Sequence, residues 1–263
     1  MTESTTERLV GRRVLVVGAS SGIGRVIGET LCEAGAHVAF AARRAEVCEE
    51  AAKSANGTAI GLGCDVTDEA QCQRVVDDAV AGLGGLDDVV YSAGAISLIA
   101  LAAADAEWWR RTFETNVMGA ALVTRAALPH LQQSTGTVVY LSSVSSIAGP
   151  WPGIGVYTST KAALNRMIET WRSEHPEVGF TRILVGPTGG GGAGGGATFD
   201  MSAMEHMARW AAMGVQSGEL GTPEAVAAAV KLVLNEETRI SDVTVVPKDG
   251  PLPWGAHEAS AAI

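Results

Sequence analysis

Short apolar runs alternate with longer segments of helical periodicity along almost the whole chain. The runs are rich in aliphatic residues and are predicted to be strands at 13–19, 37–42, 58–66, 87–94, 136–143, 180–186 and 241–247. The segments between them are predicted to be helices at about 23–34, 45–55, 68–83, 105–131, 156–174 and 222–236. Strands that are apolar throughout are typical of parallel sheets covered on both faces. The pattern therefore predicts an α/β fold with a doubly wound, seven-stranded parallel sheet and helices on both faces.

No linker interrupts this alternation, so residues 1–263 are predicted to form a single domain. The composition changes only at the glycine-rich stretch 186–199, which follows the sixth predicted strand. We interpret this stretch as a hinge for a segment that covers the substrate, at about 189–221, and a merely variable loop is the alternative. The tail 248–263 has no hydrophobic period and is predicted to be irregular.

The charge balance and the cysteines limit the kinds of partner and site. The net charge is −10, which argues against nucleic acid because a phosphate backbone needs a basic face. The N-terminal stretch 1–13 lacks the apolar core of a secretory signal, and the longest nearly apolar run, 93–106, is too short to span a membrane. The four cysteines form no CxxC pair and have no histidine cluster beside them. We therefore expect a cytoplasmic protein with buried thiols, without a metal site and without membrane or nucleic-acid partners.

A glycine motif follows the first predicted strand and opens the first predicted helix. In "VVGASSGIGR", residues 16–25, the glycines are spaced G-x-x-x-G-x-G. Glycines permit a tight turn and let a pyrophosphate reach backbone N–H groups at a helix N-terminus. An ordinary glycine turn is the alternative, but the flanking strand and helix favour a dinucleotide. The residues predicted to bind this cofactor are Gly18, Ser20, Ser21, Gly22, Ile23 and Gly24.

The end of the second predicted strand indicates which dinucleotide is bound. An acidic residue at this place would bind the ribose 2′-hydroxyl of NAD. The chain has Ala42 there, followed by Arg43 and Arg44. Arginine pairs with phosphate in a bidentate manner, so the sequence favours NADP with Arg43 at its 2′-phosphate, and NAD is the alternative. We interpret Arg44 as the start of a solvated helix.

A tyrosine and a lysine are spaced by one helical turn in "VYTSTK", residues 156–161. Tyr157 and Lys161 would therefore share one helix face. A nearby ammonium lowers the pKa of a phenol from its ordinary value of about 10 and makes it a usable general acid or base. Taken alone the motif is weak, and a helix turn without a chemical role is the alternative.

These motifs, together with "YSAG", "NVMG", "YLSS" and "VGPT", occur in the order and spacing of the short-chain dehydrogenase/reductase family. The chain resembles this family from about Arg13 to Val246. The resemblance implies a Rossmann-type fold and an NAD(P)-dependent oxidoreductase that interconverts a secondary alcohol and a ketone. It also implies a homodimer or homotetramer built through the helices at 105–131 and 156–174. Three tryptophans on these helices would be interface anchors or core residues: Trp108, Trp109 and Trp171.

The resemblance implies roles for four residues. Tyr157 would exchange a proton with the substrate oxygen, and Lys161 would tune Tyr157 and bind the nicotinamide ribose. Ser143, in "YLSS", would hold the substrate oxygen, with the serines two and three residues further on as alternatives. Asn116, in "TNVMG", would keep a water-linked proton relay in place. Each residue also has a purely structural alternative, as a turn residue or a satisfied amide.

Further cofactor contacts follow from the same resemblance. They are Asp65 and Val66 at the adenine, Ala93 and Gly94 after the fourth strand, and Pro187 and Thr188 after the sixth. A capping role at the next helix is the alternative for Asp65. The chain departs from the family pattern at Ser92, where asparagine is usual, and after Pro187, where Thr198 competes with Thr188 for the carboxamide.

Bulky apolar residues occur where these motifs would meet a substrate. Trp151 lies between Ser143 and Tyr157, and methionines recur every three residues in the covering segment. The residues predicted to contact the substrate are Ser145, Trp151, Met204 and Trp210. They indicate an apolar, cyclic or aromatic alcohol–ketone pair, with ordinary packing as the alternative. We therefore predict NADPH-dependent carbonyl reduction. The alternatives are a cofactor-binding regulatory protein without turnover and an epimerase with retained cofactor.

Overall fold

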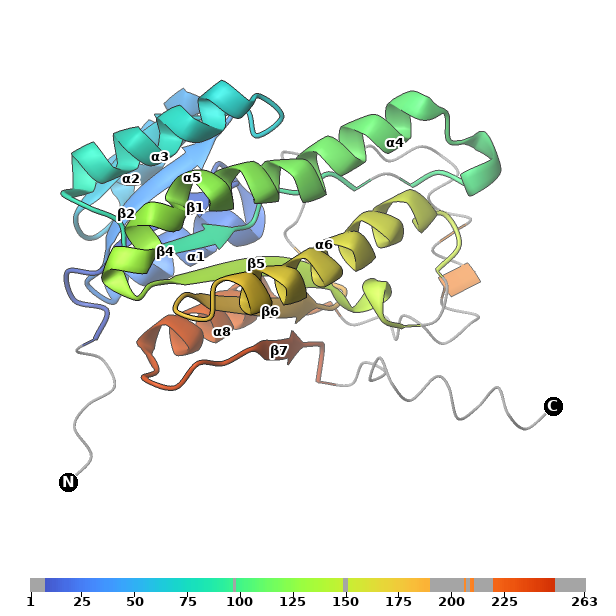
Figure 1. Ribbon diagram of the computed structural model, residues 1–263. Helices are drawn as coiled ribbons and strands as arrows, with labels where there is room; N and C mark the ends of the chain where they lie inside the picture. Colours follow the sequence, from blue (N-terminus) through green and yellow to red (C-terminus); the bar gives the residue numbers. More distant parts are fainter. Residues whose placement is uncertain are drawn as a thin grey trace.

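Seven parallel strands form one sheet in the computed structural model, which describes residues 8–96, 98–148, 151–189, 206, 209–210 and 220–248. The strands are β1 (Arg13–Val17), β2 (His37–Ala42), β3 (Ala59–Gly63), β4 (Asp88–Tyr91), β5 (Thr137–Ser143), β6 (Gly179–Val185) and β7 (Asp242–Val245). Their order is β3-β2-β1-β4-β5-β6-β7, so the direction of winding reverses between β1 and β4 (Figure 1). This order confirms the predicted doubly wound parallel sheet.

Helices cover both faces of the sheet, as predicted (Figure 1). One face carries α3 (Glu69–Leu83), α5 (Gly119–Ser134) and α6 (Gly155–Glu174), and the other carries α1 (Gly22–Glu33), α2 (Ala45–Ser54) and α8 (Pro223–Asn235). The side chain of Thr222 caps α8 by accepting a hydrogen bond from the Ala225 N–H, and Pro223 follows in the first turn. Among the described residues, no helix is long and apolar enough to cross a membrane.

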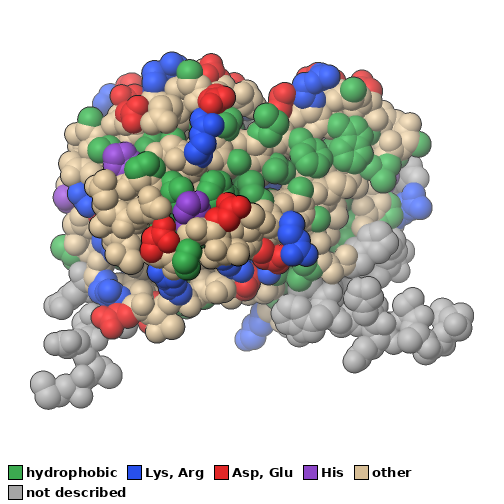
Figure 2. Space-filling view, viewed as in Figure 1, with side chains coloured by type: hydrophobic (Ala, Val, Ile, Leu, Met, Phe, Trp, Pro, Cys, Tyr) green, Lys and Arg blue, Asp and Glu red, His purple; other side chains and the backbone are tan. Residues whose placement is uncertain are grey.

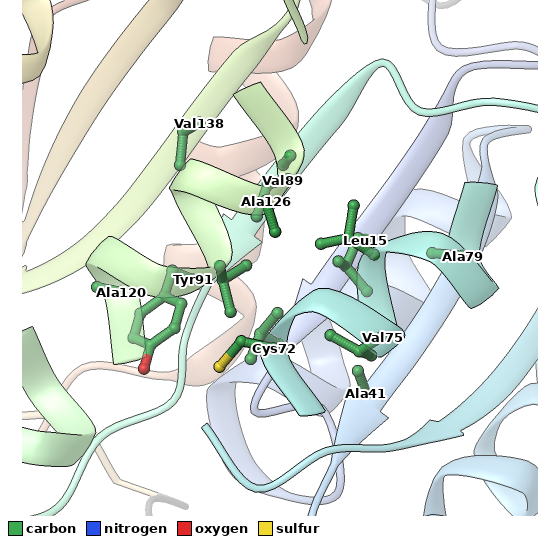
Figure 3. Close-up of a cluster of buried hydrophobic side chains, with 14 of the residues drawn as sticks. Leu15, Ala41, Cys72, Val75, Ala79, Val89, Tyr91, Ala120, Ala126 and Val138 are labelled. Carbon is green, nitrogen blue, oxygen red and sulfur yellow. The ribbon is translucent and has the colours of Figure 1, made fainter. Parts of the chain in front are cut away.

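Two hydrophobic cores lie on the two faces of the sheet. The core beneath α3, α5 and α6 contains Leu15, Val89 and Tyr91 (Figure 3). The opposite core contains Val14 and Val16. Successive residues of β1 therefore point into different cores, and this is why the strand is apolar throughout rather than alternating.

The four cysteines are buried, two in each core: Cys32 and Cys48 on the α1 face, Cys64 and Cys72 on the α3 face. Burial raises the pKa of Cys32 to about 12 and the pKa of Cys48 to about 11. Because thiolate is disfavoured in such surroundings, these two side chains act as small apolar groups. Their burial agrees with the expectation from the sequence.

One predicted helix is interrupted. The sequence pattern predicts a helix over 105–131, but the structure has α4 (Ala106–Phe113), a π-helical turn η2 (Glu114–Met118) and then α5. In the wide turn, the N–H of Gly119 donates to the carbonyl of Glu114, five residues earlier. Two short 3₁₀ turns, η1 (Leu101–Ala103) and η3 (Val144–Ser146), were not predicted either. A single wider or tighter turn is too short to change the apolar period of the sequence.

A buried ion pair fixes the amino end of β4. Arg12 donates from Nε and Nη2 to the two carboxylate oxygens of Asp88, both at 2.7 Å. The backbone N–H of Thr137, at the start of β5, donates to Asp88 Oδ1 at 3.0 Å. Asp88 is fully buried, and burial raises its pKa in spite of these partners. The carboxylate therefore depends on its hydrogen bonds, which join three segments at one point.

We expect Asp88→Asn to lower the free energy of unfolding by about 3 kcal/mol, because the half-buried guanidinium of Arg12 loses its partner charge. Denaturant unfolding monitored by circular dichroism measures the change. Glu69→Gln is the matched control, since the ion pair between Glu69 and Arg125 is largely exposed and should contribute little. An equal decrease in the free energy of unfolding for Asp88→Asn and Glu69→Gln would show that the ion pair of Asp88 contributes no more than an exposed one.

Candidate active site

The glycine motif lies at the carboxyl edge of the sheet, where β1 and β4 are neighbours. Gly18 follows β1 with a φ of +92°, and a Cβ there would lie 2.5 Å from the backbone nitrogen of Ala93. A Cβ at Gly24 would lie 2.4 Å from the carbonyl oxygen of Gly18. Both positions therefore require glycine, because any side chain would push the turn, the helix and the loop after β4 apart.

The first turn of α1 fits a phosphate group. Ser21 is the N-cap residue, and its side chain makes no hydrogen bond to the N–H groups of that turn. Those N–H groups need acceptors, and the positive end of the helix dipole favours an anion. The turn before them carries glycine at Gly18 and Gly22, both with positive φ, so a ligand can approach the backbone. The predicted motif from Gly18 to Gly24 thus has the local geometry that a dinucleotide pyrophosphate requires.

Two arginines follow β2, and one of them contacts the glycine motif. The guanidinium of Arg44 donates from Nη2 to Ser20 Oγ at 3.0 Å and to Ser21 Oγ at 3.4 Å. Arg43, the predicted reader of a 2′-phosphate, is exposed at the same strand end. Arg44 does precede α2, as expected, but its side chain turns back to the motif instead of only starting a solvated helix.

The segment after β3 has the form of a polar turn. Asp65 Oδ1 accepts hydrogen bonds from the backbone N–H of Thr67 at 3.0 Å and from its hydroxyl at 2.8 Å. Asp68 is the N-cap residue of α3 and accepts from the Gln71 N–H. Asp65 is therefore not the cap. Its turn holds Val66, which is buried, at the carboxyl edge beside the predicted nucleotide site.

Ser143 ends β5 next to the phenol of Tyr157. The hydroxyl of Ser143 lies 2.9 Å from Ser145 Oγ and accepts a hydrogen bond from the Ser145 N–H at 3.2 Å. The Tyr157 side chain as a whole is half-buried, but loss of water around its phenol raises its pKa to about 12, and a hydrogen bond with Ser143 partly opposes this rise. At neutral pH the phenol is therefore protonated.

Lys161 lies one turn further along α6 and is buried. Its Nζ donates to the carbonyl oxygen of Leu141 at 2.7 Å and lies 5.7 Å from the centroid of the Tyr157 ring. Burial lowers the pKa of Lys161 to about 8. The predicted lowering of the Tyr157 pKa by Lys161 is not produced by these groups, because burial of the phenol dominates and the ammonium is bonded to a carbonyl.

Asn116 lies in the π-helical turn and joins three parts of the site. Its Oδ1 accepts from the Ala95 N–H at 2.7 Å, and its Nδ2 donates to the Ala95 carbonyl at 3.0 Å. The same Nδ2 donates to Thr160 Oγ1 at 2.9 Å, and the Thr160 hydroxyl donates to the Tyr157 carbonyl at 2.7 Å. The amide is thus satisfied by the chain itself, and it links the loop after β4 to the helix that carries Tyr157 and Lys161.

A second polar network holds the turn after β5. Ser142 Oγ lies 2.6 Å from Asn165 Oδ1, and Asn165 Nδ2 donates to Ser146 Oγ at 2.8 Å. The Ser146 hydroxyl in turn donates to the Ser143 carbonyl at 2.5 Å. Asn165 is one turn beyond Lys161 on α6, so this network fixes Ser143 relative to the helix. Ser146 therefore supports the turn and is not placed to replace Ser143.

An apolar group of side chains packs against Tyr157. It is formed by Leu98, Ile154 and Trp210, with Ile96 and Trp151 at its edge. The rings of Trp151 and Trp210 have centroids 5.6 Å apart, and Trp210 Nε1 donates to the Pro152 carbonyl at 2.8 Å. Two of the predicted substrate residues are thus brought together beside the phenol. Met204 lies outside the described residues, as does most of the segment predicted to cover the substrate.

The loop after β4 connects the glycine motif to the tyrosine and lysine. Ala93 packs against Gly18, and a Cβ at Gly94 would lie 3.6 Å from Asn116 Oδ1 and 3.9 Å from Lys161 Nζ. Thr188, after β6, donates from its hydroxyl to the Gly186 carbonyl at 3.0 Å, and the Pro187 carbonyl accepts from the Gly221 N–H. The competing Thr198 is not among the described residues.

The sequence pattern missed Arg44, Thr160 and Asn165 as parts of the site. Thr160 and Asn165 come one residue before Lys161 and four residues after it, so the same helical spacing that links Tyr157 and Lys161 could have indicated Asn165. Nothing local indicates the partner of Thr160, because Asn116 is 44 residues away. The hydrogen bonds from Arg44 to Ser20 and Ser21 depend on how the end of β2 packs beside the glycine motif, which the sequence pattern does not show.

The sequence pattern of the short chain dehydrogenase family matches residues 12–191. The 11-beta-hydroxysteroid dehydrogenase A of Sesamum indicum is 35% identical over 187 residues, which are 69% of this chain and 53% of that protein. The chain thus spans about half the length of the curated relatives it matches.

Solved structures share the fold along almost the whole chain. An alcohol dehydrogenase of Thermococcus sibiricus, complexed with 5-hydroxy-NADP, has a TM-score of 0.78 and 22% identity, over 92% of this chain and 99% of that one. A 7 alpha-hydroxysteroid dehydrogenase, complexed with NADH and 7-oxo glycochenodeoxycholic acid, has a TM-score of 0.81 and 21% identity, over 96% and 100%. The fold is therefore found with either nucleotide. Since the family pattern covers more than half of the chain and the sheet order agrees with it, the chain belongs to the short-chain dehydrogenase family of oxidoreductases.

Proposed function

We propose that the protein reduces the carbonyl group of an apolar, cyclic substrate with NADPH, and that Tyr157 donates the proton. The observation that carries this proposal is the placement of the Tyr157 phenol, which is hydrogen-bonded to Ser143, lies close to the buried Lys161 and packs against the apolar group of the site. Reduction of a ketone consumes a proton, and the Tyr157 phenol can donate one because the nearby ammonium of Lys161 stabilises the phenolate that forms.

The chain's own residues have separate tasks in this reaction. Ser143 donates a hydrogen bond to the substrate oxygen, and Tyr157 transfers its proton to that oxygen as the carbonyl becomes an alcohol. The phenolate that remains is stabilised by the ammonium of Lys161, which lies 5.7 Å from the ring and is shielded from water. The lysine therefore acts on the charged product of proton transfer rather than on the resting phenol. NADPH, when bound at the glycine motif, would supply the hydride and leave as NADP⁺.

The preference for NADPH rests on the two arginines after β2. The strand ends at Ala42, so no carboxylate is present there to bind a 2′-hydroxyl. Arg44 lies against Ser20 and Ser21 of the glycine motif, and Arg43 is exposed beside it. Two guanidinium groups at this place favour a ribose that carries a phosphate. We assign the phosphate to both arginines, not to Arg43 alone.

The proposed substrate class rests on the apolar group beside Tyr157. The rings of Trp151 and Trp210 lie there in one apolar cluster with Leu98 and Ile154. Such a surface favours a rigid ring system over a sugar or an acyl chain with many polar groups. The relative from Sesamum indicum is named as a hydroxysteroid dehydrogenase, which is in keeping with a fused-ring substrate.

We infer that the protein assembles as a homodimer or homotetramer through the face formed by α4, α5 and α6. Figure 2 shows hydrophobic side chains across the middle of the face that these helices present. Met118, between α4 and α5, is exposed. The rings of Trp171 and Phe180 of the same chain stack with centroids 6.1 Å apart, so Trp171 contributes to the chain's own core.

Tyr157→Phe should lower the turnover of NADPH with a cyclic ketone by about 10²- to 10⁴-fold, because the variant has no proton to donate. The affinity for NADPH should stay nearly unchanged, since only one oxygen is removed. Turnover is measured by the loss of NADPH absorbance, and the affinity for NADPH by fluorescence titration.

The wild-type protein separates the competing functions in the same assays. Binding of NADPH without consumption, over a broad set of ring ketones, would favour a regulatory protein. An isomerised product without net consumption would favour an epimerase. Normal turnover by Tyr157→Phe would refute the assigned role of the phenol.

Arg43→Ala and Arg44→Ala should each weaken NADPH binding by about tenfold and leave NADH binding unchanged, because each removes a charge-assisted hydrogen bond to the 2′-phosphate. Titrations of each variant with both nucleotides test this. Ser20→Ala is the control for the contact between Arg44 and the glycine motif. If Arg44→Ala weakened the binding of NADPH and NADH equally, Arg44 would position the glycine motif instead of binding the 2′-phosphate.

Lys161→Met should change how stability depends on pH. Burial lowers the folded-state pKa of Lys161 to about 8, so between that value and about 10.5 the unfolded chain binds more protons than the folded one. The stability of the wild type relative to Lys161→Met should therefore rise by about 2 kcal/mol from pH 7 to 9.5. Denaturant unfolding at several pH values measures it. Parallel pH curves for the two proteins would show that the lysine keeps its ordinary pKa.

A further inference from the structure

The hydroxyl group of Tyr91 forms a hydrogen bond that the proposed chemistry does not use. Tyr91 is the last residue of β4, and its ring is buried in the core beneath α5, beside Ala120 and Cys72 (Figure 3). The hydroxyl donates to the backbone carbonyl of Thr115 at 2.6 Å. Thr115 belongs to the π-helical turn η2, so a core side chain holds the backbone of that turn.

The surroundings are shaped for this bond. A Cβ at Gly119 would lie 2.6 Å from the Tyr91 hydroxyl oxygen, so the glycine leaves the space that the hydroxyl occupies. The ring of a phenylalanine would fill the same core and would not bury a polar group. The apolar core alone therefore does not explain why this residue is tyrosine. The hydrogen bond to the carbonyl of Thr115 explains it. Burial also holds the pKa of Tyr91 well above its ordinary value, so the group stays a donor.

The residue after Thr115 is Asn116, whose amide joins Ala95 to Thr160. The Thr160 hydroxyl is bonded to the Tyr157 carbonyl at 2.7 Å. Each link in this series is a short, buried or half-buried hydrogen bond. A shift of the π-helical turn would therefore move the Asn116 amide away from both partners and loosen the start of α6.

We propose that Tyr91 is a positioning residue, whose hydroxyl fixes the π-helical turn so that Asn116 joins the loop after β4 to the helix carrying Tyr157 and Lys161. Tyr91 itself touches none of the reacting groups. The expected effect of Tyr91 on the reaction rate rests on the proposed function. Its expected effect on the hydrogen bonds of Asn116 does not depend on that function, so the two effects are measured separately.

The chain offers a matched control in Tyr140. Tyr91 and Tyr140 are register partners on neighbouring strands, are both buried, and belong to the same core. The Tyr140 hydroxyl lies 2.7 Å from Thr124 Oγ1, on α5 and away from the π-helical turn. Tyr91→Phe and Tyr140→Phe therefore remove the same atom from the same core, and only the first releases the turn.

Amide hydrogen exchange is the primary test, since it needs no substrate. In Tyr91→Phe the N–H of Ala95, which is bonded to Asn116 Oδ1, should exchange at least tenfold faster than in the wild type. In Tyr140→Phe it should exchange at the wild-type rate, after correction for any common loss of global stability. Equal exchange at Ala95 in the two variants would overturn the proposal.

Kinetics give the second readout. In Tyr91→Phe the kcat for ketone reduction should fall at least tenfold, with KM for the ketone changed less than threefold, because the proton donor is misplaced while the apolar surface is intact. Tyr140→Phe should keep kcat within twofold of the wild type. An unchanged kcat in Tyr91→Phe would overturn the positioning role.

Gly119→Ala also disturbs the hydrogen bond between the Tyr91 hydroxyl and the Thr115 carbonyl. It is the second variant to test if Tyr91→Phe does not fold. The added methyl group would lie 2.6 Å from the Tyr91 hydroxyl oxygen and 2.9 Å from the Val66 carbonyl oxygen, so it displaces the hydroxyl as well as the turn after β3, and Ala95 should again exchange at least tenfold faster. Wild-type exchange at Ala95 in this variant would also overturn the proposal. If the wild-type protein reduced no ketone, the proposed function would fail, and the exchange data would still decide the role of Tyr91.

Discussion

The backbone contact between Gly18 and Ala93 is the constraint on which the rest of the site depends. β1 and β4 are hydrogen-bonded neighbours, although two strand–helix units separate them in the chain. Their carboxyl ends can approach only because Gly18 has no side chain. The chain leaves β1 in one direction and β4 in the other, so the groups that follow these strands converge at one edge of the sheet. A nucleotide-binding turn and a proton donor thereby become neighbours.

The fold could be predicted from the sequence because its strands are apolar on both sides. Val14 and Leu15 enter opposite cores, which is the signature of a covered parallel sheet. β1 and β3 were predicted too long at their carboxyl ends, because the apolar residues Ala19 and Val66 lie beyond the strands, in the turns that follow them. The break at Glu114 was invisible, since one wide turn leaves the apolar period of its helix almost unchanged.

The candidate site was predictable where its groups are close in sequence and unpredictable where they meet through the fold. The spacing of Tyr157 and Lys161 identifies a shared helix face, and the lysine does lie near the ring. The sequence could not show that burial outweighs charge, so the direction of the Tyr157 pKa shift was wrong. Bonds such as Asn116 to Thr160 join residues far apart in the chain, and only the packing of α6 against the π-helical turn brings them together.

The burial of the four cysteines has a practical consequence for work on this molecule. They lie in both cores, on both faces of the sheet, and for Cys32 and Cys48 the loss of water suppresses the reactive thiolate. An alkylating reagent would therefore reach them only when a core opens. The rate of thiol modification thus reports the opening of each face separately, and mass spectrometry of the labelled peptides would show which half of the molecule opens first.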